Sequence, residues 1–496
     1  MKRLLTIYTA LLLGLTAALA SPNTMYFMEY LPYQAMMNPA LQPRCKSYVE
    51  LPLISTISAS ASTGGLTLND FFYIKDGKLV TFLHPEYGTK EAVYSKLMRA
   101  PGFDTEVDLS LLGFGFRLKE KGYVTINASL RANTAIGMPS DIFTLGMYGT
   151  PDTVNVNSYA INMPISMNVF LDLSGGYSQK INDQWTAGGR VHLLYGLANA
   201  RLKSDDLALD MSHQEWKLSG TVNGNMSVIG VGLDTDENGN VTGFSTPSSM
   251  DNFFKTLDCS FGASLDLGAV YKPVPELKIS LSVKDLGFIV WKTNATKCSG
   301  SIEGVYTGVG YPLSDEDFSS TLEVGQLTAT KGTYTTMMNG KIYAGVEYDF
   351  LNNMMSLGLV SKTSYNYSHW NEEITVAYNL RPCSWFGLSA SYSLISGRSS
   401  TLGLGVNLRI PPFSIYAVSD YTPVHYTSSG IPYRTSAVNV QAGIVLTFGC
   451  MKKKVKEAAP EEQVVLEEKS AEESEEMSAE SVAESLEEPQ ENEVEE

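Results

Sequence analysis

Long hydrophobic runs are scarce in this 496-residue chain. After residue 20 the sequence contains no run of about 18 apolar residues, so it offers no membrane-spanning helix beyond its start. Charged residues make up only 18% of the chain, whereas Gly (42) and Tyr (27) are abundant, a composition that favours many strands over long surface helices. The rest of the chain is therefore either soluble or crosses a membrane as strands.

The signatures of common enzyme sites are also absent. With only five His, the sequence has no Gly-x-Ser-x-Gly elbow, no His-Glu-x-x-His motif and no phosphate-binding glycine loop. No basic stripe of the kind that binds nucleic acid is present. We therefore predict no enzymatic activity, no cofactor and no nucleic-acid partner. A hydrolase site formed by residues that are far apart in the sequence is the least favoured alternative.

The two ends of the sequence differ from its body. A basic start, an apolar stretch and the small-x-small site Ala18-Leu19-Ala20 predict a signal peptide over residues 1–20. Residues 451–496 hold 17 Glu and 5 Lys, which gives −12 of the net charge of −17 and leaves −5 for residues 1–450. Such a segment cannot bury enough apolar surface to fold, so we predict a disordered acidic tail that could bind a periplasmic or secretion-system protein.

Apolar and polar residues alternate through most of the remaining sequence. In one segment Ile165, Met167 and Val169 are separated by Ser166 and Asn168, and similar segments recur between residues 105 and 448. A soluble β-sandwich also alternates, but its strands have about five or six residues, whereas a tilted membrane strand needs about 9 to 11. The longer segments here favour strands that face lipid.

Fourteen such strands are expected, at residues 47–60, 105–118, 123–135, 164–178, 185–199, 259–271, 277–291, 341–350, 354–365, 372–380, 386–395, 400–409, 413–420 and 437–448. Short turns alternate with longer loops between them, which is typical of a bacterial outer-membrane barrel with both termini in the periplasm. The predicted fold is all-β: a single closed antiparallel transmembrane β-barrel over residues 47–450, surrounded by outer-membrane lipid.

Aromatic residues near the short turns predict an interfacial girdle, because amphipathic rings favour the membrane surface. The expected members are Tyr123, Tyr177, Trp185, Tyr271, Tyr348, Phe350, Tyr378, Phe386 and Phe448. Trp291, at the other end of its strand, is expected in the outer girdle. The alternative is that aromatic residues simply favour strands.

Asn38-Pro39-Ala40 precedes the first predicted strand and resembles the N-terminal region of fatty-acid-transporter-like barrels, a class that includes the type IX secretion shuttle barrel. A closer resemblance, to a family of uncharacterised outer-membrane barrels, is carried by Asn38-Pro-Ala-Leu-Gln-Pro-Arg44, Leu51-Pro-Leu-Ile54, Lys284-Asp-Leu-Gly-Phe-Ile-Val-Trp-Lys292 and Lys341-Ile-Tyr-Ala-Gly-Val-Glu-Tyr348. The resemblance implies a fourteen-stranded barrel whose N-terminal segment, residues 21–46, enters or plugs the lumen. It also implies the passage of small or hydrophobic molecules, with a docking barrel for a secretion or surface-assembly system as the alternative.

Charged residues on the inward faces are candidates for lining a substrate path. They are Arg131, Asp172, Arg190, His192, Asp266, Lys278, Lys284, Glu347 and Asp349. The alternative is that they pair with one another, as charges in a polar lumen commonly do. His192 is the leading single candidate for ligand binding or pH sensing.

Five cysteines and one acidic turn complete the candidates. Cys45 lies just before the first predicted strand and Cys450 just after the last, so in a closed barrel of an oxidising compartment they could form a disulfide across the seam. Cys259 and Cys298 are a second possible pair, which would leave Cys383 over. Asp234-x-Asp236-x-Asn238-Gly239 matches half of a calcium loop, but position twelve is Ser245 instead of Glu, so we predict a hairpin turn and no metal.

Overall fold

A computed structural model describes residues 22–450, except for 53, 64–65, 77, 85, 87, 99–101, 150–156, 213–214, 247–259, 307–326, 367–368, 397–398 and 422–435. The predicted signal peptide and acidic tail lie outside the described residues. Among those that are described, no helix has the length and hydropathy to cross a bilayer.

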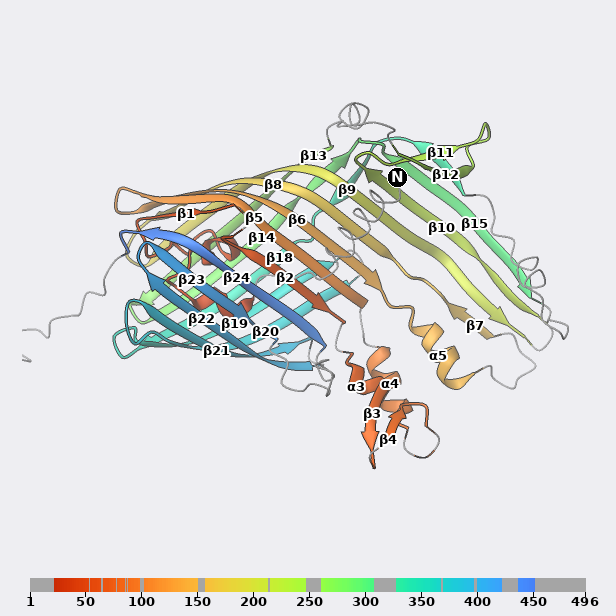
Figure 1. The fold of residues 1–496 in the computed structure, drawn as a ribbon, viewed down its shortest axis with the longest axis horizontal. Coiled ribbons are helices and arrows are strands. Elements are labelled where there is room, and N and C mark those ends of the chain that lie inside the picture. Colours follow the sequence, from red (N-terminus) through yellow and green to blue (C-terminus); the bar gives the residue numbers. More distant parts are fainter. Residues whose placement is uncertain are drawn as a thin grey trace, which may run out of the picture. The chain divides into compact units, whose positions relative to one another are not determined.

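Fourteen antiparallel wall strands form a closed barrel, as predicted (Figure 1). The first is interrupted, because β1 (Ser47–Glu50) and β2 (Ile57–Ser62) both pair with β5 on one side and β24 on the other and so close the ring. The remaining wall strands are β5 (Gly102–Leu118), β6 (Gly122–Gly137), β8 (Ile165–Lys180), β9 (Trp185–Met211), β13 (Ser260–Val274), β14 (Leu277–Trp291), β18 (Lys341–Phe350), β19 (Met355–Asn366), β20 (His369–Leu380), β21 (Phe386–Ile395), β22 (Ser399–Ile410), β23 (Phe413–Ser419) and β24 (Ala437–Phe448).

The alternation of the sequence places apolar side chains outside and polar ones inside. Along β18, Ile342, Val346 and Tyr348 are exposed on the outer surface, whereas Tyr343 and Glu347 are buried in the interior. A closed ring with an apolar exterior satisfies every backbone group of its strands within the sheet, which is the condition for crossing a bilayer as strands.

Six short turns connect the strands at one end, here called the turn end. At the other end, the loop end, five connections are long, whereas those from β19 to β20 and from β21 to β22 are short. Near the turn end Tyr177, Trp185, Tyr348, Tyr378 and Phe448 are exposed on the outside, as the girdle requires. The rings of Trp185 and Tyr271 stack there at 4.6 Å, and Phe350 and Phe386 are half-buried.

Two of the predicted girdle residues are not on the outer surface. Tyr123 is buried inside the wall, where its ring stacks on that of Tyr48 at 6.5 Å. Trp291 is also fully buried, because a β-bulge at Asp285, where φ is +57°, shifts the register and exchanges the two faces of β14. Beyond the bulge Phe288 points outward and Trp291 inward, which reverses the expectation from strict alternation.

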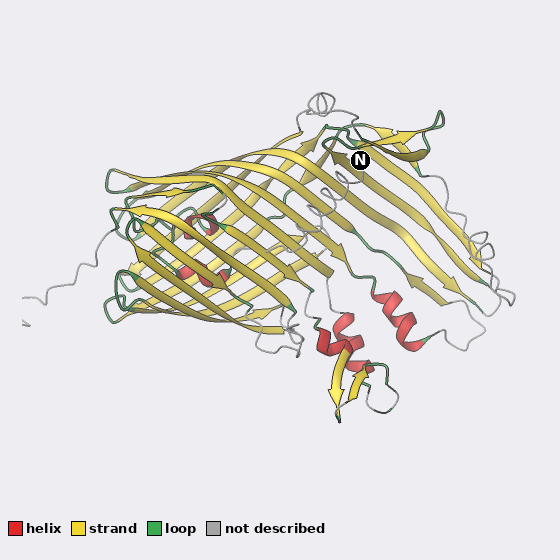
Figure 2. Ribbon diagram, viewed as in Figure 1, coloured by secondary structure: helices red, strands yellow, loops and turns green. Residues whose placement is uncertain are grey.

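The loop end carries structure of its own, where the sequence predicted loops and one hairpin turn (Figure 2). The strand β9 continues past the wall and pairs with β10, which in turn pairs with β15, so that these strands form an extended ribbon. The loop-end elements are α3 (Leu68–Phe71), β3 (Phe72–Lys75), β4 (Lys78–Thr81), α4 (Lys90–Leu97), α5 (Ser140–Tyr148), β7 (Asn157–Ala160), β10 (Trp216–Val228), β11 (Gly232–Thr235), β12 (Val241–Ser245), β15 (Thr296–Tyr306), β16 (Thr328–Lys331) and β17 (Tyr334–Met337).

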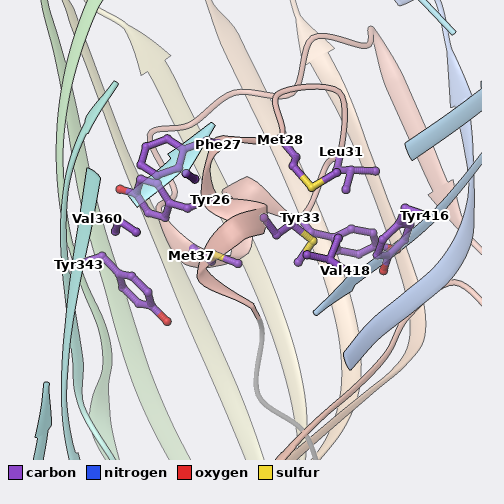
Figure 3. Close-up of a cluster of buried hydrophobic side chains, with 12 residues drawn as sticks. Tyr26, Phe27, Met28, Leu31, Tyr33, Met37, Tyr343, Val360, Tyr416 and Val418 are labelled. Carbon is purple, nitrogen blue, oxygen red and sulfur yellow. The ribbon is translucent and has the colours of Figure 1, made fainter. Parts of the chain in front are cut away.

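The N-terminal residues lie inside the barrel. They form η1 (Asn23–Phe27) and α2 (Gln34–Met37), and almost every residue from 22 to 40 is buried. Their apolar side chains form the main core cluster, together with inward-facing residues of β18, β19, β20 and β23; the members in Figure 3 include Tyr26, Phe27, Leu31, Tyr33, Met37, Tyr343, Val360, Tyr416 and Val418. Residues 22–44 are called the plug from here on.

A disulfide joins the start and the end of the barrel. Cys45 and Cys450 are the predicted pair, and their Cα atoms lie 3.7 Å apart. The bond links the chain just before β1 to the chain just after β24, which are neighbouring strands at the turn end. Cys298 and Cys383 are free thiols. Cys259, which the sequence offered as a possible partner of Cys298, lies outside the described residues.

Candidate functional site

The plug is held by polar contacts to strands from all sides of the lumen. The backbone N–H groups of Asn23 and Thr24 donate to the carboxylate of Asp420, at the end of β23, and the hydroxyl of Thr24 lies 2.6 Å from that of Ser391. On the opposite side, the Tyr26 hydroxyl donates to Ser280 of β14 at 2.9 Å. These contacts satisfy polar atoms at the start of η1 that have no partner within that short helix.

A buried charge network fixes the middle of the plug. The carboxylate of Glu29 forms ion pairs with Lys278 of β14, Arg381 and Arg44. Lys278 also lies 3.0 Å from Glu347 and 3.1 Å from Asp349, while Arg381 lies 2.8 Å from Glu347 and donates to the backbone carbonyl of Phe27 at 2.9 Å. The network holds three carboxylates and three cations, so its charges balance.

The ionisation of Glu29 follows from these neighbours. Burial alone would raise the pKa of Glu29, but the cations of Lys278, Arg381 and Arg44 outweigh burial and hold that pKa well below its usual range. The carboxylate is therefore charged at neutral pH. Three carboxylate oxygens, from Glu29, Glu347 and Asp349, lie within 4.8 Å of one another, but Lys278 and Arg381 already supply the cations between them.

Glycines in the wall make room for the plug. A Cβ atom at Gly268 of β13 would lie 2.1 Å from the side-chain oxygen of Asn38, and one at Gly188 of β9 would lie 2.4 Å from the carbonyl oxygen of Pro39. Similarly, a Cβ at Gly358 would lie 2.7 Å from the ring of Phe27. These close approaches need residues without side chains, which explains glycine in the middle of long strands.

The Asn38-Pro39-Ala40 element is therefore seated in the lumen, where the resemblance placed it. All three residues are buried, and the Asn38 side chain caps the turn by accepting from the backbone N–H of Ala40 at 2.9 Å. Its amide donates to the hydroxyl of Tyr26 at 3.2 Å and to the carbonyl of Leu281 in β14 at 3.3 Å. The element thus links η1 to the wall.

A second charge network lies deeper in the lumen. Arg131 of β6 pairs with Asp172 of β8 at 3.0 Å and with Asp285 of β14 at 2.8 Å. His192 of β9 lies between two carboxylates, with Nδ1 2.8 Å from Asp172 and Nε2 3.1 Å from Asp266. These residues come from five neighbouring strands, so the network runs along the inner face of one part of the wall.

The nine predicted lumen residues all face the interior, but they fall into separate groups. Lys278, Glu347 and Asp349 hold the plug, whereas Arg131, Asp172, His192 and Asp266 belong to the second network. Arg190 approaches the plug, because its guanidinium lies 2.9 Å from the sulfur of Met36. Arg131, Asp172, Arg190, His192 and Lys284 border a cavity of about 70 Å³.

Another cavity, of about 80 Å³, lies nearer the loop end. Its walls include two ion pairs, Lys341 with Glu106 and Lys362 with Glu373, the latter at 3.3 Å. Both cavities are lined largely by hydroxyl, amide and charged groups. They are small compared with the 300 Å³ or more that is typical of sites for drug-sized ligands.

Three important residues were not identified from the sequence. Asp285 escaped because strict alternation assigned it to the outer face, and Arg381 because it lies in a short turn. Glu29 lies in a segment with no periodicity from which an inward face could be read. Along β14 the alternation of inward and outward residues is broken at Asp285, where φ is positive. The pattern of apolar and polar residues in one sequence does not reveal such a bulge.

The calcium-like turn forms the predicted hairpin between β11 and β12. The carboxylate of Asp236 accepts from the backbone N–H groups of Asn238, at 2.9 Å, and Asn240, at 2.8 Å. These bonds also hold the pKa of Asp236 below its usual range, chiefly through the side chain and the backbone of Asn240. The polar side chains of this segment thus stabilise a hairpin turn, as predicted from the sequence.

Comparison with known proteins identifies a family. The sequence pattern of a family described as "Family of unknown function (DUF5723)" matches residues 39–420. No curated protein matches the chain. This agrees with the resemblance to uncharacterised barrels that the sequence motifs predicted.

Several solved structures are similar to the chain. A CymD monoaromatic hydrocarbon channel is 10% identical, with 85% of this chain and 94% of that chain covered and a TM-score of 0.38. The Pseudomonas putida toluene transporter TodX is 9% identical, with coverage of 83% and 92% and a TM-score of 0.37. A Pseudomonas aeruginosa FadL homologue is 12% identical, with coverage of 88% and 100% and a TM-score of 0.37. At these scores the similarity does not bear on the function of this chain, which has to follow from its own geometry.

Proposed function

Because the chain belongs to the DUF5723 family, whose description assigns no function, we propose one from its geometry: it is an outer-membrane barrel through which small or hydrophobic molecules pass when the plug moves. The observation that carries the proposal is the way in which the plug is held. Side-chain contacts and single hydrogen bonds join it to the wall, and neither η1 nor α2 shares a strand ladder with the barrel.

The plug can therefore move while the wall stays closed. Every wall strand is paired on both sides by other wall strands, so displacement of residues 22–44 leaves the ring of backbone hydrogen bonds complete. The disulfide at Cys45 keeps the end of the plug tethered at the seam. The plug therefore fills the lumen, contributes no strand to the wall and stays attached to the barrel, which are the properties expected of a segment that gates passage.

The apolar exterior supports an outer-membrane location with lipid as the surrounding partner. Short turns throughout one end and five long connections at the other support an orientation with the turn end in the periplasm. In that orientation, Cys45 and Cys450 would lie in an oxidising compartment, which agrees with their disulfide.

The test is solute uptake by liposomes that contain the purified full-length protein. We expect low uptake of a radiolabelled small sugar and of a radiolabelled apolar aromatic solute. A variant lacking residues 22–42 retains Cys45, and its uptake of at least one solute is expected to rise ten-fold or more. A matched variant lacking residues 452–496 controls for truncation. Uptake by the plug-free barrel no greater than that of empty liposomes would refute the proposal.

A docking barrel for a secretion or surface-assembly system is the second candidate. It is favoured by the small volume of the lumenal cavities, about 70 and 80 Å³ with the plug seated, which suits a closed scaffold better than an open passage. The predicted acidic tail would then be the binding arm. Co-purification of a periplasmic protein with the full-length chain, and its loss on deletion of residues 452–496, would support this candidate instead.

A further inference from the structure

The two lumenal cavities adjoin one another along the same wall strands. Three of these strands, β2, β5 and β6, run side by side (Figure 1). The row beside the deeper cavity, of about 70 Å³, consists of the cross-strand partners Ser58, Asp108 and Arg131. The row beside the other cavity, of about 80 Å³ and two residues nearer the loop end, consists of the partners Ser60, Glu106 and Asn133. Side chains two residues apart share one face of a strand, so the two rows form a continuous surface, here called the polar track.

The charges of the polar track are compensated within the lumen. Asp108 lies 4.0 Å from Arg131, which has two further carboxylate partners, and Glu106 forms an ion pair with Lys341. In the described lining of the two cavities, seven carboxylates stand against five Lys and Arg side chains. An anion would therefore meet no excess of positive charge, and a charged solute of either sign would compete with ion pairs that are already formed. The polar track thus favours a neutral solute.

Two buried amides beside the deeper cavity contain acceptors without a hydrogen-bond partner. Asn127 of β6 and Gln441 of β24 both border this cavity, and both are more than nine-tenths buried. Among the residues that the structure describes, the Oδ1 atom of Asn127 and the Oε1 atom of Gln441 have no donor. Because a buried acceptor without a partner is costly, a group that enters the adjoining cavity and donates to these oxygens is favoured.

The plug borders the deeper cavity through Tyr33 and Met36. Movement of the plug would therefore enlarge this cavity and extend the polar track toward the turn end, where the disulfide of Cys45 tethers the plug. The polar track consequently lies on the route that the proposed passage function requires.

We propose that the passage carries small neutral solutes that are rich in hydroxyl groups, of which a monosaccharide is the simplest probe. A hydroxyl group both donates and accepts, so it can donate to the carboxylate and amide oxygens of the lumen and accept from its amide and ammonium groups. Such a solute replaces the hydrogen bonds of the water that it displaces, whereas an apolar solute does not. This inference rests on the proposed passage function and names its substrate class.

The test compares three radiolabelled solutes in liposomes that contain the full-length protein or its variant Gly268→Val. In that variant the added side chain would overlap Asn38 of the plug. The solutes are glucose, which is neutral, gluconate, which is an anion with the same number of carbon atoms, and toluene, which is apolar. Each rate is corrected by subtracting the rate of entry into empty liposomes. In Gly268→Val we expect glucose to enter faster than gluconate and toluene by about ten-fold or more, because each loses hydrogen bonds or ion pairs that glucose leaves intact.

The variant Asn127→Leu/Gln441→Leu, made in the Gly268→Val chain, removes both amides and keeps side chains of similar size. Its uptake of glucose should be slower by about ten-fold or more, because two hydrogen-bonding groups are lost. Gln184→Leu in the same chain is the matched control, since Gln184 is exposed in the turn between β8 and β9. Asn127→Ser/Gln441→Thr keeps a hydrogen-bonding group at each position and should retain uptake. Electrophoretic mobility before and after heating establishes that each variant folds.

Selective entry of glucose that the double Leu variant loses would support the inference. Entry of gluconate or toluene as fast as glucose, or equal glucose uptake by the double Leu variant and Gln184→Leu, would overturn it and leave the passage function standing. Entry of none of the three solutes above empty liposomes would instead refute the passage function, and this inference with it.

Discussion

The interior of the barrel and the ribbon beyond it differ in how far their cationic side chains are exposed to solvent. Inside, Lys278 and Arg381 are buried, and each lies within ion-pair distance of carboxylates of Glu29 and Glu347. On the ribbon, Lys203 and Lys297 are exposed. A buried charge is tolerated only when partners compensate it, so the interior cations serve the structure, whereas the exposed ribbon cations are solvated by water.

Among the changes to the interior, replacing a wall glycine by a larger residue should have the largest effect, measured as solute uptake. In Gly268→Val, the new side chain would occupy the position of the Asn38 oxygen, 2.1 Å from the added Cβ. We expect displacement of the plug and at least a ten-fold rise in liposome uptake of a small sugar. In the control, Gly175→Val, the new Cβ has no neighbour within 4 Å, so uptake should be unchanged. Equal uptake by the two variants would show that the fit of Asn38 to the wall does not control passage.

Removing the charge of Glu29 should have the next largest effect, measured as the rate at which the plug is proteolysed. Glu29→Gln leaves Lys278 and Arg381 without one of their carboxylates, and loss of one partner of a buried pair costs about 3–5 kcal/mol. The plug should then dissociate from the wall more readily, measured as faster proteolysis of the N-terminal segment in detergent. Glu91→Gln, at an exposed position of α4, is the control. An unchanged proteolysis rate would mean that the ion network contributes little to docking.

Breaking the disulfide should weaken the seam without opening the lumen. Cys45→Ser removes a bond between residues 405 apart in sequence, and loss of such a bond costs about 2–5 kcal/mol. The temperature at which the barrel unfolds, followed by its electrophoretic mobility after heating, should fall. Cys383→Ser, which removes a free thiol, should leave that temperature unchanged. A normal unfolding temperature in Cys45→Ser would show that strand pairing alone holds the seam.

Mild acidification should have the smallest effect on the plug. The pKa of Glu29 is lowered in the folded chain, so its contribution to docking is present above its unfolded pKa and is lost only as pH falls through the lower, folded value. Proteolysis of the plug should therefore be constant from about pH 8 to pH 5 once protease activity is corrected for, and rise only in stronger acid. A rise between pH 7 and pH 5 would contradict the assignment of Glu29 as the anchoring carboxylate.

Much of the fold could be predicted from the sequence because every wall strand repeats one physical rule. Alternation of apolar and polar residues fixed the fourteen strands, and the positions of Cys45 and Cys450 relative to the first and last of them predicted the pair that the structure joins. That rule fails where a bulge exchanges the faces, as at Asp285, and this one residue accounts for the misplaced Trp291.

The candidate site was less predictable. The nine inward charges were identified correctly as inward, but alternation carries no information about which strands face one another across a lumen. Their division into a network around Glu29 and another around Arg131 depends on where the plug places Glu29 and on the bulge that turns Asp285 inward. The ribbon of β9, β10 and β15 at the loop end was also missed, because most of it lies in segments that the sequence analysis assigned to loops.

The most direct measurement of the central claim uses a plug that can be locked and released. The hydroxyls of Thr24 and Ser391 lie 2.6 Å apart, so Thr24→Cys/Ser391→Cys should form a disulfide between the plug and β21. In liposomes with this variant, we predict that solute uptake falls to the level of empty liposomes when oxidised and returns to the native level on reduction, with the unmodified protein treated identically as the control. Equal uptake by the oxidised and reduced variant would contradict the claim that the plug closes the passage.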